Sequence, residues 1–155
     1  MMESTAEPIY FYKAHDPYGC FSNFSLHPIH CEALDWPTVE HFYQAHKFLP
    51  IHQQDLIDKI RAAPTPEIAA ALGRDPQHPK RPDWEDIKRT VMWQGVWTKF
   101  KTHPDIAQIL LATGDAAIIE NSPVDYYWGC GADGSGSNYL GKVLMRVRRQ
   151  LRHGE

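Results

Sequence analysis

Hydrophobic residues recur along much of the chain at intervals of three and four, the spacing that places them on one face of a helix. The clearest case is residues 139–151, whose apolar positions are Leu140, Val143, Leu144, Val147 and Leu151. The basic residues of this stretch fall largely on the opposite side: Lys142, Arg146, Arg149 and Arg152. The pattern predicts an amphipathic helix that buries one face.

Five more helices are predicted from the same spacing and from the residues that start and stop helices. They are expected at 38–48, around 56–60 with an end near Pro64, from Thr65 to a stop at Gly73, from Asp83 to about Lys101, and from Pro104 through Leu110. The long helix after Asp83 carries its apolar face on Trp93, Val96, Trp97 and Phe100.

Short apolar runs predict strands at 9–12, 29–34 and 116–119. Residues 74–82 contain three prolines and are expected to form an exposed loop. Helices therefore dominate over a few short strands, which predicts the α+β class and a single compact, mostly helical domain over residues 9–152. Residues 1–8 are expected to be a flexible tail.

Composition narrows the possible functions. The 155 residues are 43% hydrophobic and 23% charged with a net charge of −3, so a broad electrostatic grip on nucleic acid is not indicated. No apolar run approaches the roughly 20 residues of a membrane span, and the N-terminus lacks a signal-peptide pattern. Three cysteines without CxxC spacing, Cys20, Cys31 and Cys130, favour reduced thiols and a cytoplasmic location.

The nine histidines raise the question of a metal site. His41 and His46 are five residues apart, so they do not share a helix face, and the segment that holds His27, His30 and Cys31 has no second ligand cluster. No metal site is expected.

The helix predicted at 38–48 holds the first candidate chemistry. Glu40, Tyr43 and Lys47 share one stripe at spacings of three and four, and seven residues at 1.5 Å rise separate the Glu40 and Lys47 backbones by roughly 10 Å. That gap is about the length of a small sugar, so one substrate could contact all three. The alternative is a solvated helix whose Glu40 and Lys47 merely offset the helix dipole.

The segment after the strand at 116–119 holds a second cluster. Glu120, Asp125 and Trp128 lie in a loop that continues through four glycines to Asn138, directly before the last helix. A glycine-containing loop that enters a helix N-terminus can bind an anion, which makes phosphate on the ligand a reasonable hypothesis. The alternative is a flexible loop whose aromatics cap the core. Trp93 is normally a core residue on such a helix, but it could join Trp128 and Tyr43 in stacking on a base.

Taken together, these segments resemble the NADAR family, the YbiA-like proteins. The matching pieces, in the order of the family, are Gly19-x-x-Ser22-Asn23-Phe24, Pro37-Thr38-x-Glu40-His41-Phe42-Tyr43-Gln44-Ala45-x-Lys47-Phe48, Thr113-Gly114-Asp115, Glu120, Asp125-x-x-Trp128-Gly129, and Gly136-x-Asn138-x-Leu140-Gly141-x-x-Leu144-Met145-x-x-Arg148. They span residues 9 to 152, and residues 74–82 are the least typical part.

The resemblance implies an N-glycosidase. Family members are linked to phosphoribosylated pyrimidine intermediates of riboflavin synthesis and to ADP-ribose attached to guanine, so the expected partner is a phosphoribosyl or ADP-ribosyl small molecule. Nucleic acid could be a modified substrate, held by a basic rim that includes Lys80, Arg81, Lys88 and Arg89. The competing class is a non-catalytic reader of ADP-ribose.

The expected catalytic residues are Lys47, as a nucleophile that forms a Schiff base, with Glu40, Asp125 and Glu120 as acid or base candidates. A lysine in this role needs a lowered pKa. The expected substrate-binding residues are Ser22, Asn23, Phe24, His41, Tyr43, Trp93, Trp128, Gly129, Asn138, Leu140 and Gly141. The scheme needs no metal or redox cofactor.

Overall fold

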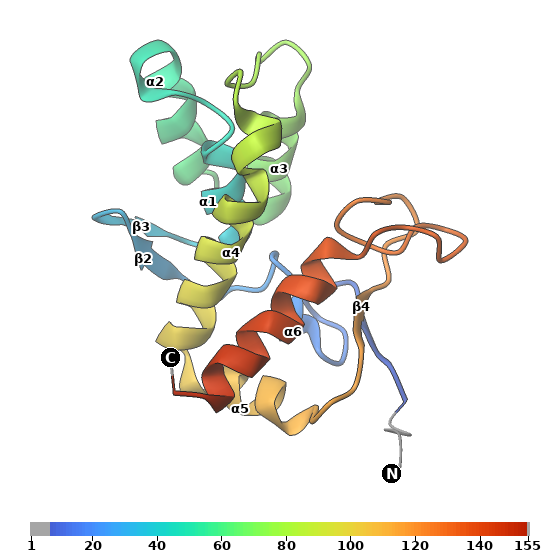
Figure 1. Ribbon diagram of the computed structural model, residues 1–155. Coiled ribbons are helices and arrows are strands. Elements are labelled where there is room, and N and C mark those ends of the chain that lie inside the picture. The colour runs from blue at the N-terminus through green and yellow to red at the C-terminus, as the bar shows by residue number, and fades with distance from the viewer. Residues whose placement is uncertain (1–6, 155) are drawn as a thin grey trace. The chain divides into compact units, whose positions relative to one another are not determined.

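The computed structural model describes residues 7–154 (Figure 1), so most of the tail predicted at 1–8 lies outside the described residues. Six α-helices, one 3-10 helix and four three-residue strands make up the described part. The α+β class and the predominance of helices are confirmed. By its contacts the chain divides into two compact units: residues up to Ser25 with those from Phe100 onward form the first, and Leu26–Lys99 form the second.

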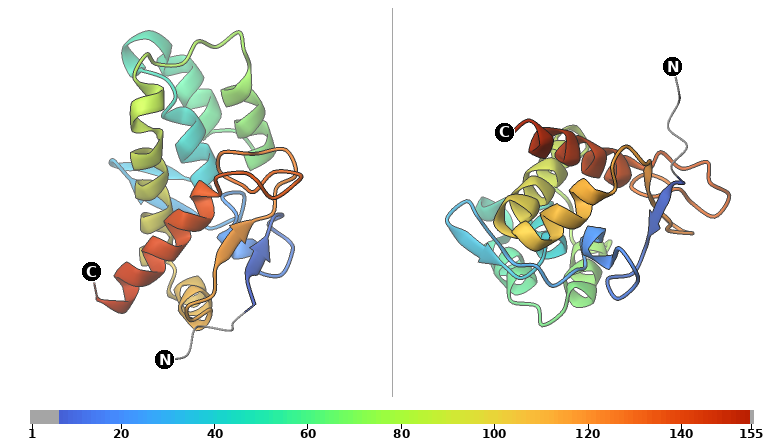
Figure 2. Two further views of the ribbon diagram at one scale, coloured as in Figure 1. Left: turned by 45° about the vertical axis from the view of Figure 1, so that its right-hand side comes forward. Right: turned by 90° about the horizontal axis from the view of Figure 1, so that it is seen from below.

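A parallel pair of strands joins the N-terminal and C-terminal parts of the chain that make up the first unit. β1 (Ile9–Phe11) lies beside β4 (Ile118–Glu120), with Ile9 opposite Ile118 and Phe11 opposite Glu120 (Figure 2). The 3-10 helix η1 (Gly19–Phe21), α5 (Pro104–Ala112) and α6 (Tyr139–Arg152) complete the unit, and α6 packs on both β4 and α5. The strand expected at 116–119 begins two residues later and ends at Glu120.

The amphipathic pattern of α6 is confirmed, because Leu140, Leu144 and Val147 are all buried. One basic residue of α6, Arg148, does not lie on the exposed side. Arg148 is buried, and its Nη1 donates to Thr113 Oγ1 and to the carbonyl of Ala116, both at 2.8 Å. Arg148 therefore ties α6 to the turn that leads from α5 into β4.

The second unit begins with a hairpin of β2 (Ile29–Cys31) and β3 (Leu34–Trp36). The single strand expected over 29–34 is wrong, because the chain reverses at Glu32 and Ala33, with φ values of 56° and 66°. Two such left-handed residues match the twist of a two-residue hairpin. Asn and Gly normally fill these positions, so the sequence carried no recognisable turn signal.

Helix α1 (Val39–Ala45) begins at the expected cap, where Thr38 Oγ1 accepts from the His41 amide at 3.1 Å. It ends three residues before the predicted limit. Lys47 donates its amide to Gln44 O and Phe48 to Ala45 O, which tightens the chain into turns. The next helix, α2 (Pro50–Arg61), starts after Leu49, where Pro50 disfavours helical backbone.

Helix α3 (Pro66–Arg74) starts at the predicted cap Thr65, but Gly73 does not stop it. A Cβ at Gly73 would lie 2.1 Å from Gln44 Oε1, so this glycine makes room for a side chain of α1. Helix α4 (Trp84–Thr102) has the predicted extent, with Val96 and Phe100 buried.

Replacing Arg148 by leucine is expected to lower the free energy of unfolding by about 1–3 kcal/mol, because the buried Ala116 carbonyl loses its donor. Urea unfolding followed by circular dichroism measures the change. Arg149→Leu removes the same charge from the exposed side of α6 and should change stability little. Equal losses in the two variants would contradict a specific role for Arg148.

Candidate active site

The end of α1 gathers the predicted carboxylate, tyrosine and lysine. Glu40, Tyr43 and Lys47 are all buried, with 4%, 7% and 8% of their surface exposed. Lys47 Nζ lies 5.6 Å from the centroid of the Tyr43 ring. A solvated helix face would leave these side chains in water, so the alternative of a purely dipole-offsetting pair does not describe them.

Burial changes the acid–base behaviour of Lys47. Desolvation lowers the pKa of its amine to about 8 from the usual 10.5. The carboxylate of Glu40 opposes this shift, while the positive charges of Arg74, Lys80 and Lys88 add to it. About a tenth of the amine is then uncharged at pH 7, against well under a hundredth for an ordinary lysine. An uncharged amine is the nucleophilic form.

Glu40 is held in position by neighbours on two helices. Gln44 Nε2 donates to Glu40 Oε2 at 2.7 Å, and Arg74 Nη2 lies 3.8 Å from the same oxygen. Gln44 is buried, and Gly73 leaves the space that its amide fills. The spacing of four residues between Glu40 and Gln44 could have identified this pair. No local signal pointed to Arg74, which comes from α3.

His41 was expected to bind substrate, but its surroundings assign it to the framework. Its Nε2 lies 3.0 Å from the carbonyl of Ala63, and its Nδ1 lies 2.8 Å from Thr38 Oγ1. Desolvation lowers the pKa of the ring, so the neutral form is favoured. With both nitrogens occupied and the side chain buried, His41 fastens α1 to the segment between α2 and α3.

Trp93 also lies in the second unit, half-buried on α4. Its ring stacks on that of Trp97, with centroids 5.5 Å apart and planes inclined by 10°. Within this unit Trp93 therefore pairs with a second tryptophan one helical turn away, and its stacking on a base with Trp128 and Tyr43 stays a prediction. Tyr43 instead meets Trp84 edge-on at 5.1 Å.

The remaining candidates belong to the first unit, where several of them build the loop between β4 and α6. Asp125 Oδ1 accepts from the amides of Tyr127 and Trp128 at 2.9 and 2.8 Å, so the carboxylate shapes the turn that presents Trp128. Trp128 and Glu120 are half-buried, and the carbonyl of Glu120 accepts from the amide of Cys130.

Three residues that were expected to bind substrate hold β4 and α6 together or lie in the core: Asn138, Leu140 and Gly141. Asn138 accepts from the amide of Glu120 and donates to the carbonyl of Ile118, both at 2.9 Å. Leu140 is in the core. A Cβ at Gly141 would lie 2.1 Å from the Ile118 carbonyl oxygen, so glycine lets α6 approach β4. Gly129 is similarly confined, because the carbonyl oxygens of Asp125 and Glu120 lie 2.9 and 3.0 Å from where a Cβ would be.

The anion site expected at the start of α6 is contradicted. The amides of Asn138, Tyr139 and Leu140 donate to the carbonyls of Gly129, Tyr127 and Trp128, each at 3.0 Å. The glycine loop folds back and supplies acceptors to the very groups that would bind phosphate.

The predicted trio Ser22, Asn23 and Phe24 follows η1. Ser22 and Asn23 are buried, and Ser22 Oγ accepts from the amide of Phe24 at 3.1 Å. Within residues 7–154 no three His, Cys, Asp or Glu side chains gather in a way that could hold a metal ion. No helix in the same range is long and apolar enough to span a membrane.

The chain is similar over most of its length to named proteins of other organisms. A protein of Nostoc punctiforme named as an N-glycosidase is 53% identical over 145 residues, covering 94% of this chain and 93% of that protein. The N-glycosidase YbiA of Escherichia coli K12 is 43% identical, covering 92% and 88%. A riboflavin biosynthesis protein of maize, PYRR, is also 43% identical, but the match spans only 25% of it.

A solved structure has the same fold. The NMR structure of the E. coli protein YbiA superposes with a TM-score of 0.88 at 40% identity, covering 98% of this chain and 89% of that one. The NADAR domain model matches residues 10–152, which hold the helix α1, Lys47 and the loop before α6. A match of this length, with near-complete overlap of both relatives and structure, places the chain in the NADAR domain family.

Proposed function

We propose that this N-glycosidase hydrolyses the bond between a phosphorylated ribose and an amine nitrogen, and that the Lys47 amine attacks the anomeric carbon. The enzyme class follows from the family and from relatives that carry that name. The observation that carries the mechanism is the buried Lys47 amine, whose pKa is lowered to about 8 beside the carboxylate of Glu40.

The chemistry requires an amine of this kind. When the ribose ring opens, the C1–N unit becomes an imine, to which the uncharged Lys47 amine adds. The bond from C1 to the heterocyclic amine then breaks, the leaving nitrogen takes a proton, and a Schiff base joins C1 to Lys47. Water releases the sugar phosphate and restores the lysine, so one substrate and one water give one amine and one sugar. Glu40 is the candidate to carry the protons.

Ribosylaminopyrimidine phosphates are the proposed substrate class. Two relatives are named riboflavin biosynthesis proteins, from maize and from Vibrio vulnificus, and this chain matches 25% and 39% of their lengths. Such intermediates carry ribose on an exocyclic amine, which can form the imine that the lysine route needs.

The deciding assay presents purified protein with two substrates in parallel and follows products by mass spectrometry. One is the ribosylaminopyrimidine phosphate, and the other is an oligonucleotide with ADP-ribosylated guanine. Cleavage of the first alone supports the proposal. Cleavage of the second alone would make the chain an enzyme that reverses guanine modification, and binding without cleavage would make it a reader of ADP-ribose.

Lys47→Ala is expected to abolish turnover, since loss of a covalent catalyst costs orders of magnitude in kcat. Borohydride added during turnover should trap a wild-type adduct that carries the mass of the sugar phosphate on Lys47. Lys47→Met controls for folding: below pH 8 burial penalises the charged amine, so this variant should be no less stable than wild type at pH 7. More than about a tenth of wild-type activity in Lys47→Ala would exclude the nucleophile.

The pH dependence of kcat/KM should report the same amine. Activity is expected to rise with pH through an apparent pKa near 8 and then level off, because only the uncharged amine attacks. Arg74→Gln removes a positive charge that lowers the pKa of Lys47, so the rising limb should move to higher pH. Lys59→Gln, an exposed change on α2, should leave the profile in place. If Arg74→Gln leaves the rising limb of the kcat/KM profile at the same pH, the titrating group is not Lys47.

A further inference from the structure

The Lys47 amine lies over the aromatic ring of Tyr43, the residue four positions before it. Nζ is 5.6 Å from the ring centroid, within the roughly 6 Å at which the negative face of an aromatic ring attracts a cation. Among residues 7–154, no hydrogen bond and no ion pair engages this ammonium, and the Glu40 carboxylate acts on it through its charge. The ring is therefore the direct contact that stabilises the charged amine.

Burial makes this contact stronger than it would be at the surface. Tyr43 and Lys47 are both buried, so water competes little for the positive charge. The attraction between a cation and an aromatic face grows when the cation is desolvated. The Tyr43 ring thus opposes the desolvation that lowers the pKa of Lys47.

The charged groups around the amine come from several elements of the second unit. The Glu40 carboxylate on α1 favours the charged form of the amine. Three positive charges favour the uncharged form: Arg74 at the end of α3, Lys80 in the segment after it, and Lys88 on α4. The Tyr43 ring has no net charge, so its effect depends on which way its face is turned.

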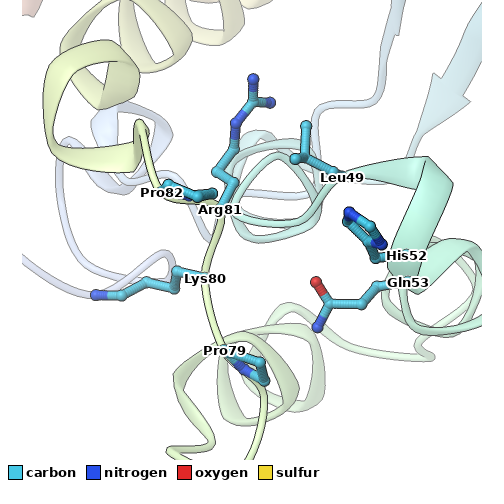
Figure 3. Close-up of a pocket in the computed structure, with 7 residues that line it drawn as sticks. All are labelled: Leu49, His52, Gln53, Pro79, Lys80, Arg81 and Pro82. Atoms are coloured by element: carbon cyan, nitrogen blue, oxygen red, sulfur yellow. The ribbon is translucent and has the colours of Figure 1, made fainter.

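Trp84, the first residue of α4, fixes how the Tyr43 ring is turned. The two rings meet edge-on, with centroids 5.1 Å apart and planes inclined by 63°, and Trp84 is buried. The Trp84 amide donates to the carbonyl of Arg81 at 3.2 Å, and the Arg81 amide donates to the carbonyl of Lys47 at 2.7 Å. The segment that Figure 3 draws around Arg81 therefore holds the Lys47 backbone and leads into the residue that packs on Tyr43.

We propose that Tyr43 is a positioning residue for Lys47: the face of its ring holds the charged amine in the resting enzyme, and Trp84 keeps that face turned toward the amine. The inference rests on the proposed role of Lys47 as the nucleophile and adds a group that controls its charge. The ring and the neighbouring cations act in opposite senses, so together they set how much of the amine is uncharged before substrate arrives.

The titration test follows the charge of Lys47 in the full chain without any substrate. Protein labelled with ¹³C at the lysine Cε atoms is titrated by NMR, and the Lys47 signal is identified by its loss in Lys47→Met. Tyr43→Phe keeps the ring, and phenylalanine analogues with increasing numbers of fluorines at the same position withdraw electrons from its face with little change in shape. The pKa of the amine is expected to fall along the series, by about 1 in the most fluorinated analogue.

The direction of this change follows from the charged form. A weaker ring face stabilises the ammonium less, so the proton leaves at lower pH. The same analogues in place of Tyr10, an exposed residue of β1, should leave the titration of Lys47 unchanged. A pKa that stays constant along the series at Tyr43, or that falls equally along the series at Tyr10, overturns the inference.

Kinetics give a second readout that a merely structural role of Tyr43 would not move. Along the fluorinated series the rising limb of the kcat/KM profile should shift to lower pH, opposite to the shift expected for Arg74→Gln. If wild type cleaves no N-glycoside but the amine titration still follows the fluorines, the proposed reaction fails and the positioning role stands. A limb that stays in place while the amine titration moves would leave the positioning role intact and exclude Lys47 as the nucleophile.

The role of Trp84 is tested in the same titration. Trp84→Leu removes the ring that turns Tyr43, so fluorination at Tyr43 should change the pKa of Lys47 less than in the parent chain. Trp84→Phe keeps an aromatic partner and should retain most of the effect. Equal sensitivity to fluorination in Trp84→Leu and in the parent chain would overturn the role of Trp84.

Discussion

The burial of the Lys47 amine is the constraint on which the proposed chemistry of this protein depends. A charged amine loses hydration when it is buried, which lowers its pKa. The carboxylate of Glu40 stabilises the charged form, whereas the positive charges of Arg74, Lys80 and Lys88 destabilise it. The balance brings the pKa to about 8, so a useful fraction of the amine is uncharged near neutral pH. Removing the carboxylate or the cations would shift that balance in opposite directions.

The backbone around Lys47 explains how the amine reaches this setting. Helix α1 ends at Ala45, so Lys47 lies beyond it, in the tight turns that lead to α2. Its carbonyl accepts from the Arg81 amide, which brings the segment between α3 and α4 against it. This segment thereby brings Lys80 near the amine, and Arg74, the last residue of α3, adds a second positive charge.

The loop before α6 differs from the surroundings of Lys47, because many of its polar groups form hydrogen bonds within the first unit. Asp125 orders the turn around Trp128, Asn138 joins β4 to α6, and the loop carbonyls occupy the first amides of the helix. The loop therefore combines residues that hold the framework with residues that are only half-buried, such as Trp128 and Glu120, whose contact with substrate stays a prediction.

The sequence by itself determined the order of the helices, their caps at Thr38 and Thr65, the buried face of α6, and the grouping of Glu40, Tyr43 and Lys47, because these depend on spacings and side chains within a few residues. The helical stripe was wrong at its end, because Lys47 lies beyond the last residue of α1. The hairpin turn at Glu32 and Ala33 could not be predicted from the sequence, since neither residue is typical of that turn. Only the tertiary structure decided that Gly73 makes room for Gln44 and that Arg148 is buried. It also decided that the side chains of His41 and Asn138 form hydrogen bonds to backbone carbonyls within the protein. Each of these depends on a partner distant in sequence, and no local pattern specifies which partner it meets.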